Sequence, residues 1–169
     1  MIKNFENKPS AVLFVAFTLF FIGCVGVVIL PLFDDQINAP TANAEVRNYA
    51  EDSAEARGRQ LYIEYGCFTC HTQMVRSVKA DLNQNLGPVT AGGDYKYELP
   101  NLMGSNSNGP DLMWVGTRYN EEWQRQHLLD PQSTSPGSIM PSFDYLTDEE
   151  LDDLVAYLMS LKPADYEQQ

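Results

Sequence analysis

Two cysteines and a histidine fall within five residues of this chain, in the order Cys67, Phe68, Thr69, Cys70 and His71. C-x-x-C-H is the spacing at which two thiols capture the vinyl groups of one haem as thioethers while the adjacent histidine binds the iron. One helical turn separates the cysteines, so both sulfurs face the same porphyrin edge. The motif therefore predicts one covalent haem c, attached through Cys67 and Cys70 and ligated by His71.

Three other interpretations of the motif remain open at this point. A zinc site needs two further ligands, and the chain offers only Cys24 and His127, neither of them near another candidate. A thioredoxin-like pair needs a strand before the motif, where this sequence has a helical pattern. A structural disulfide between residues three apart is strained. The covalent haem is the interpretation that the sequence favours.

An uncharged apolar run occupies residues 11–33, AVLFVAFTLFFIGCVGVVILPLF. As a helix this run has a length of about 34 Å, slightly more than a hydrocarbon core of about 30 Å. Two lysines precede the run and two aspartates follow it. The positive-inside rule then predicts a single transmembrane anchor with residues 1–10 in the cytoplasm and the rest of the chain on the other side.

A cleaved signal peptide is the alternative for this run. Ala42-Asn43-Ala44 resembles an A-x-A cleavage site, and the residues before the run are basic. However, the apolar region of a signal peptide has about 7–15 residues, whereas this run is longer and lies far from the alanines. We therefore expect a retained anchor.

The chain after the anchor is strongly acidic, with 9 basic and 22 acidic residues and a net charge of −13. This charge argues against nucleic acid as a partner and would repel anionic lipid headgroups. Two interpretations stay open: a solvated acidic surface, or a surface that steers a basic redox partner.

Two segments of the chain after the anchor have the residue pattern of a helix. Ser53–Tyr65 begins with a candidate N-cap and is followed by Gly66 just ahead of the haem motif. Thr147 and Glu150 form a capping box at the start of a second helix. Its apolar residues recur at helical spacing and predict a core-packing face: Leu151, Leu154, Val155, Leu158 and Leu161.

Two other segments lack a strong period. Residues 34–52 contain Pro, Asn and Ala and predict a linker from the membrane. The 37 residues from 72 to 108 are rich in Gly, Asn, Asp and Tyr. Because so long a loop is usually functional or disordered, and because this one contains aromatic anchors, we expect an ordered insert that covers the haem edge or docks on a partner.

An electron-transfer haem needs a sixth iron ligand, and methionine is a common one. Met140 is the expected ligand because Pro141 rigidifies an extended segment just ahead of the last helix. The alternatives are a gap-filling Met140 and ligation by His127, which lies in an amphipathic helical pattern. The other methionines are terminal, too close to His71, too early in the chain or within packed segments: Met1, Met74, Met103, Met113 and Met159.

The Gly109-Pro110 pair predicts a rigid turn. We expect the carbonyl of Pro110 to hold the second ring nitrogen of His71 and so to fix the orientation of the ligand. An ordinary Gly-Pro turn is the alternative.

Further residues carry a family resemblance: Cys70-His71-Thr72-Gln73-Met74-Val75-Arg76, Gly109-Pro110-Asp111-Leu112, Val115-Gly116-Thr117-Arg118-Tyr119, Trp123, His127-Leu128 and Met140-Pro141. Their order resembles class I cytochromes c. With the anchor and the long insert, the chain is more closely similar to the membrane-anchored monohaem subunit (subunit II) of cbb(3)-type cytochrome c oxidases. Asn106-Ser107-Asn108 departs from the family, in which this tract is often basic.

The resemblance implies a mainly α protein, with a single N-terminal transmembrane helix followed by a class I cytochrome c-like domain. That domain would cover residues 53–162, with the insert at 72–108 and a tail at 163–169. It also implies a bacterial inner-membrane protein with a periplasmic haem domain, in which Arg118 pairs with a haem propionate; a surface arginine is the alternative.

The function implied by the resemblance is electron relay. A dihaem cytochrome c subunit or a soluble cytochrome c would be the donor, and the b-type haem of a catalytic haem–copper oxidase subunit would be the acceptor. The chain itself would have no catalytic residues. A stand-alone membrane-tethered shuttle, the small subunit of a nitric oxide reductase, and a non-haem zinc or thiol protein are the other functions considered.

Overall fold

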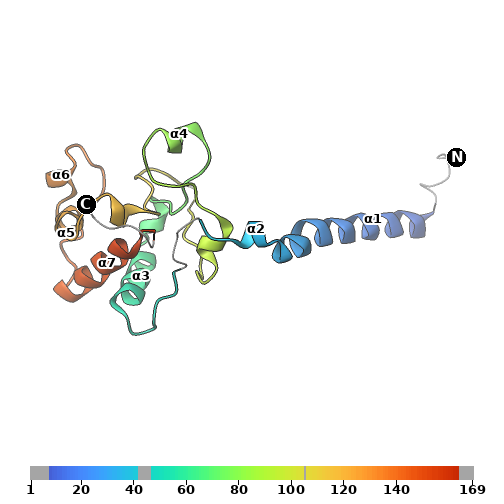
Figure 1. The fold of residues 1–169 in the computed structure, drawn as a ribbon, viewed down its shortest axis with the longest axis horizontal. Coiled ribbons are helices and arrows are strands. Elements are labelled where there is room, and N and C mark those ends of the chain that lie inside the picture. The colour runs from blue at the N-terminus through green and yellow to red at the C-terminus, as the bar shows by residue number, and fades with distance from the viewer. Residues whose placement is uncertain (1–7, 42–46, 105, 164–169) are drawn as a thin grey trace. The chain divides into compact units, whose positions relative to one another are not determined.

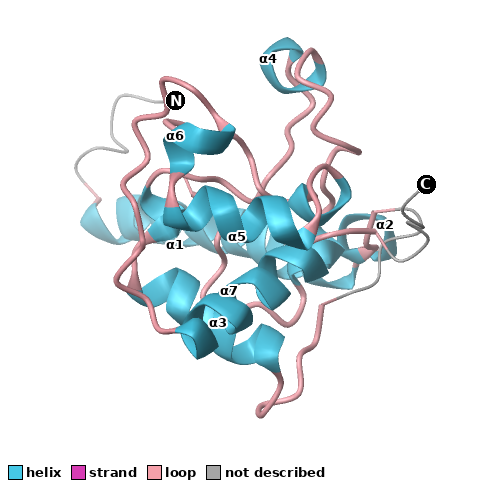
Figure 2. Ribbon diagram, turned by 90° about the vertical axis from the view of Figure 1, so that its left-hand side faces the viewer, coloured by secondary structure: helices cyan, strands magenta, loops and turns pink. Residues whose placement is uncertain are grey.

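The computed structural model describes residues 8–41, 47–104 and 106–163. The chain divides into two compact units, and the boundary in the sequence lies between Ala39 and Pro40. Helices account for all the regular structure of these residues, and no strand is present among them (Figures 1 and 2). The prediction of a mainly α protein is confirmed. The predicted cytoplasmic segment and tail fall largely outside the described residues.

The first unit is built on one long apolar helix. Helix α1 (Pro9–Gly23) continues through the π-helical η1 (Cys24–Ile29) into the 3-10 helix η2 (Leu30–Phe33). Together they form a 25-residue span with a mean hydropathy of 2.9. This span is long and apolar enough to cross a membrane, in agreement with the predicted anchor at 11–33.

A short polar cap closes this helical span. The side chain of Asp34 accepts a hydrogen bond from the backbone N–H of Gln36 at 2.9 Å and starts helix α2 (Asp35–Asn38). The Asn38 amide donates to the carbonyls of Pro31, Leu32 and Asp34 at 3.0, 3.1 and 2.9 Å. The carbonyls of Pro31 and Asp34 also accept from the backbone N–H groups of Asp34 and Asn38, at 3.2 and 3.0 Å, so the Asn38 amide adds to the bonds that end this span. The predicted linker at 34–52 thus begins with a helical turn instead of irregular chain, and its residues 42–46 lie outside the described part.

The second unit is centred on the crossing of α3 (Ala54–Glu64) and α7 (Asp148–Ser160). A Cβ atom at Gly58 would overlap the backbone carbonyl of Asp153, so the two helices approach closely only because residue 58 is glycine. Arg57 donates two hydrogen bonds to Asp153, at 2.7 and 2.6 Å, beside the crossing. Both predicted helices and their caps are therefore confirmed.

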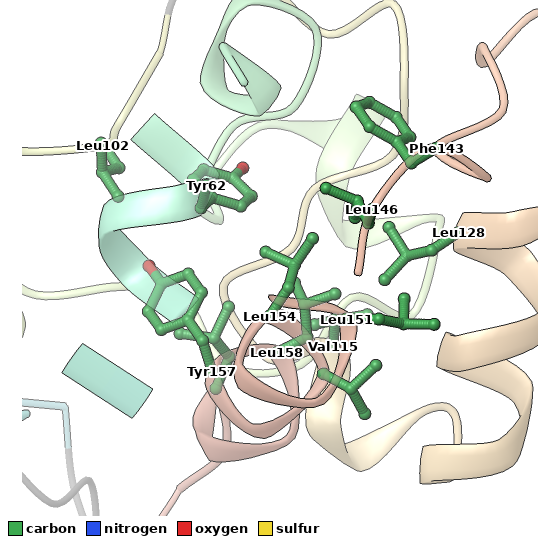
Figure 3. Packing of buried hydrophobic residues seen from close by; sticks show 12 residues of the cluster. Tyr62, Leu102, Val115, Leu128, Phe143, Leu146, Leu151, Leu154, Tyr157 and Leu158 are labelled. Atoms are coloured by element: carbon green, nitrogen blue, oxygen red, sulfur yellow. The ribbon is translucent and has the colours of Figure 1, made fainter. Parts of the chain in front are cut away.

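The apolar face of α7 forms the main core (Figure 3). All five residues predicted for this face are at most 5 % exposed. Tyr157 of α7 packs edge to face on Tyr62 of α3, with ring centroids 5.5 Å apart. Leu102, from the predicted insert, contributes to the same core. Met159 packs against it, as expected for a core methionine.

Short helices complete the second unit: η3 (Cys67–Thr69), α4 (Lys79–Leu82), η4 (Gly92–Tyr95), η5 (Val115–Thr117), α5 (Glu121–Leu129) and α6 (Pro131–Thr134). Helix α5 packs against α6 and α7 (Figure 2). It begins at the N-cap Asn120, whose side chain accepts a hydrogen bond from the N–H of Trp123.

The insert is held by polar contacts around a small second core. Val75, Leu86, Met113 and Trp114 form this core, and the indole N–H of Trp114 donates to the Pro88 carbonyl at 2.8 Å. Two ion pairs add to it. Arg76 binds Asp81 at 2.9 Å within the insert, and Arg47 binds Glu98 at 2.6 Å. Both side chains of the second pair are buried, at 7 and 3 % exposure.

Candidate functional site

The C-x-x-C-H motif lies on a tight turn at the end of α3. Gly66 takes a positive φ of 69°, which ends the helix and turns the chain into η3. Cys67 is half-buried against the main core, and Cys70 is exposed. Neither sulfur is in a disulfide. Burial raises the pKa of the Cys67 thiol to about 11, so this sulfur lies in an apolar setting.

His71 is oriented by the Gly-Pro turn. Its Nδ1 lies 2.8 Å from the Pro110 carbonyl, which is the expected contact. Because a carbonyl only accepts, Nδ1 must donate, and Nε2 is left to bind another group. Burial lowers the pKa of His71, while the Pro110 bond and the charge of Asp111 act against it. A Cβ atom at residue 109 would overlap the imidazole, so a glycine at this position leaves the room that the ring needs.

A buried carboxylate next to this turn was not assigned any role from the sequence. Asp111 is 6 % exposed. Its Oδ2 accepts from the Thr72 hydroxyl at 2.6 Å and from the N–H of Met74 at 2.8 Å, and its Oδ1 accepts from the N–H of Met113 at 2.8 Å. The only signal in the sequence was an aspartate directly after the Gly-Pro pair.

Met140 lies in an extended segment between α6 and α7. Its side chain is half-buried and packs against the main core, as Cys67 and Phe68 also do. The N–H of Phe143 donates to the Leu128 carbonyl at 2.9 Å, which fastens the segment to α5. The structure thus holds the Met140 segment against the same core as the haem motif. Ligation of iron by Met140 stays a prediction.

Arg118 is half-buried, and its partners are carbonyl groups. Its guanidinium donates to the carbonyl of Asp111 and, at 3.4 Å, to that of Leu86. Burial lowers the pKa of Arg118, and the charge of Asp111 opposes this. Within the described part of the chain, no side-chain carboxylate lies within ion-pair distance of it. A partly desolvated guanidinium with this environment fits a carboxylate supplied by a bound group.

His127, the second candidate for iron ligation, belongs to a stack of three rings, two on α5 and one just before it. Trp123 stacks on Tyr119 with centroids 3.6 Å apart and on His127 at 4.5 Å. The Nδ1 of His127 lies 2.6 Å from the hydroxyl oxygen of Thr134. Burial, and then the charge of His71, lowers the pKa of His127. The stack was missed from the sequence, although the spacing of four between Trp123 and His127 places these two rings on one face of α5.

Comparison with known proteins agrees with this geometry. Residues 2–162 match the family described as "Cytochrome C oxidase, mono-heme subunit/FixO". The chain belongs to this family. It therefore carries one covalently bound haem c and has the electron-transfer role of a cytochrome c.

Two curated relatives support the assignment. Cytochrome c oxidase subunit 2 of Alkalihalophilus pseudofirmus is 28% identical over 120 residues, which is 71% of this chain and 29% of the relative. Cytochrome c2 of Agrobacterium tumefaciens is 35% identical over 104 residues, 58% of this chain and 87% of the relative. The chain spans less than a third of the first relative, so partners and acceptors are treated below as proposals.

The residues of the site fit a covalent haem. Two free thiols stand three residues apart, His71 keeps one ring nitrogen free, and Arg118 has no carboxylate partner among the described residues. Both cysteines lie on the turn that carries His71. Cys70 is exposed there and Cys67 is half-buried.

Proposed function

We propose that this chain is a membrane-anchored monohaem cytochrome c of a terminal oxidase. It relays electrons from a dihaem or soluble cytochrome c to the b-type haem of a catalytic haem–copper subunit that reduces oxygen. The observation that carries the proposal is the His71–Pro110 hydrogen bond beside two free thiols, in a chain of the mono-heme oxidase subunit family. The apolar helix would cross the bacterial inner membrane once, with the N-terminus in the cytoplasm and the haem domain in the periplasm.

Each site residue then has a defined task. Cys67 and Cys70 hold the haem as thioethers, and His71 and Met140 ligate its iron, while Arg118 binds a propionate. When bound, the haem supplies a one-electron couple. Two protein ligands keep small molecules away from the iron, so the chain passes electrons and leaves oxygen chemistry to its partner.

The sixth ligand can be tested by substitution. Met140→Ala should open the iron to carbon monoxide, whereas Met140→His should keep a low-spin iron and lower its reduction potential, because imidazole is the stronger donor. Met159→Leu is the matched control, since Met159 packs against the same core. If the iron of Met140→Ala excludes carbon monoxide as well as the control does, another residue is the ligand.

The distribution of charge supports two separate contact surfaces. The insert at 72–108 contains three basic and three acidic residues, which leaves six basic and nineteen acidic residues in the rest of the chain after Phe33. The whole net charge of −13 thus lies outside the insert. The insert also exposes large apolar side chains: Val78, Leu82, Tyr97 and Leu99. A neutral surface with apolar side chains fits a stable contact with the catalytic subunit, and an acidic one fits transient encounter with a basic donor.

Purification of the tagged chain from its native membranes tests the proposal. We expect a large copper-containing subunit with b-type haem to co-purify and the complex to consume oxygen. The double variant Leu82→Asp/Leu99→Asp should keep its covalent haem but lose the large subunit, because both residues are exposed on the insert. Tyr145→Asp, which alters an exposed aromatic residue outside the insert, is the matched control.

Other outcomes would identify the alternatives. A complex that reduces nitric oxide but not oxygen would make the chain the small subunit of a nitric oxide reductase. A haem-bearing chain that purifies alone would make it a tethered shuttle. Normal oxygen consumption by the insert variant would show that the insert is not the docking surface.

A further inference from the structure

Asp111 is a buried carboxylate whose hydrogen bonds reach two segments of the chain. It is 6 % exposed and accepts from the Thr72 hydroxyl and from the N–H groups of Met74 and Met113. All three contacts come from donors, so both oxygens act as acceptors. Burial of a carboxylate is costly unless donors surround it, and here the donors come from two separate segments.

Two of these bonds join the segment directly after the haem motif to the turn that orients His71. Two backbone bonds run beside them: the N–H of Gly109 donates to the Cys70 carbonyl at 3.0 Å, and the N–H of Leu112 to the Thr72 carbonyl at 2.8 Å. Pro110 lies between these two bonds and directly precedes Asp111. The place of its carbonyl opposite His71 Nδ1 is therefore fixed from both sides.

The same residue reaches Arg118 through its backbone. The guanidinium of Arg118 donates to the Asp111 carbonyl. One residue thus links the turn that holds His71 to the arginine proposed to bind a propionate. Removal of the Asp111 side chain would loosen both connections without changing a residue that touches the cofactor.

We propose that Asp111 is a positioning residue: through Pro110 it sets the hydrogen bond of His71 and thereby lowers the reduction potential of the haem. The inference rests on the proposed ligation of the iron by His71. A firm bond at Nδ1 makes the imidazole a stronger donor to the metal. The negative charge of the carboxylate acts in the same direction, because it favours the oxidised iron.

The Asp111→Asn variant of the full chain tests this inference. We expect covalent haem to be retained, the reduction potential to rise, and the Nδ1 proton of His71 to exchange with solvent about tenfold faster, the effect of losing roughly one hydrogen bond. Proton NMR of the detergent-solubilised, reduced chain follows the exchange. A potential and an exchange rate equal to those of the parent chain would overturn the inference.

Asp81→Asn is the matched control. Asp81 is also buried, at 4 % exposure, and also accepts three hydrogen bonds, all of them from Arg76 in the insert. Its loss should leave the His71 exchange and the potential unchanged. An equal effect in this control would show that any buried carboxylate of the domain acts in the same way, and the inference would fail.

Two further variants separate position from charge. Asp111→Glu keeps the charge but moves the oxygens, and Thr72→Val keeps the charge but removes one donor. Both should speed the exchange of the His71 proton. If only Asp111→Asn raises the potential and neither of the others changes the exchange, the carboxylate acts by charge alone and is not a positioning residue. If the Asp111→Asn protein does not accumulate, the exchange rate of the His71 proton in Thr72→Val tests the positioning role instead.

The ligation of iron by His71 is checked separately. His71→Gly should open the iron to carbon monoxide on the face that His71 occupies, and before carbon monoxide is added it should lose the low-spin spectrum. A low-spin His71→Gly variant would overturn the proposed ligation. Loss of the low-spin spectrum in His71→Gly, together with an unchanged Asp111→Asn, would overturn only the positioning role.

Discussion

The main core and the insert differ in what holds them together. Around α3 and α7, apolar side chains such as Leu154 and Tyr157 are fully buried and pack in one cluster. Apart from Leu102, which joins the main core, the insert packs on a second core of four buried residues, two of which follow the insert in the chain. Single polar pairs such as Arg76–Asp81 and Arg47–Glu98 add to this small core. Apolar packing is shared among many neighbours, so its loss affects the whole domain. A polar pair is local and depends on pH, so its loss should affect only the insert.

The largest effect is expected in the main core. Leu154 is 0 % exposed, and Leu154→Ala should lower the free energy of unfolding by about 3 kcal/mol through the cavity that it leaves. Hydrogen exchange should then accelerate in both the core and the insert, since both are lost in global unfolding. Leu86→Ala, in the second core, is the comparison and should accelerate exchange in the insert alone. Equal acceleration everywhere in both variants would remove the distinction between the two regions.

A pH-dependent effect is expected at the buried ion pair of the insert. Burial raises the pKa of Glu98, and the charge of Arg47 opposes this only in part. A raised pKa means that the folded insert binds the proton more tightly than the unfolded chain. Proton binding by Glu98 therefore stabilises the folded insert. This stabilisation is fully present below the ordinary pKa of a glutamate and is lost as the pH rises through the raised pKa.

The protection of the Glu98 amide, which donates to the Tyr95 carbonyl, reports this change. Its protection factor should fall with rising pH in this window, by at most about tenfold per pH unit. Glu98→Gln should abolish the slope, and Glu122→Gln, an exposed glutamate on α5, should leave it intact. A slope that persists in Glu98→Gln would assign it to another group.

The smallest effect is expected at Trp114. Trp114→Phe keeps an aromatic ring in the second core but removes the indole bond to the Pro88 carbonyl. A loss of about 1 kcal/mol should follow, confined to the loop that contains α4. Tryptic cleavage after Lys79 measures this loop and should be about fivefold faster, while the unfolding midpoint stays nearly constant. A shift of the midpoint without faster cleavage would place Trp114 energetically with the main core.

The same difference explains what could be predicted from the sequence. Periodic leucines and the capping residue Thr147 specify α7 locally, so its bounds were close to correct. The haem motif and the Gly-Pro turn were recognised because their spacing has one dominant chemical use. The Arg47–Glu98 and Asp111–Thr72 contacts join residues 51 and 39 positions apart, and no local pattern marks such partners. The insert was therefore expected to be ordered, but its contacts could not be named.

The uneven distribution of charge has a consequence for ionic strength. All of the net charge lies outside the insert, so the two surfaces should respond differently to salt. At an ionic strength of 0.15 M the Debye length is about 8 Å, and attraction between exposed charges is strongly screened. Encounters at the acidic part should therefore slow as salt is added, whereas an apolar contact at the insert should hold or tighten. Salt would in this way change the rate at which electrons arrive without releasing the subunit from its complex.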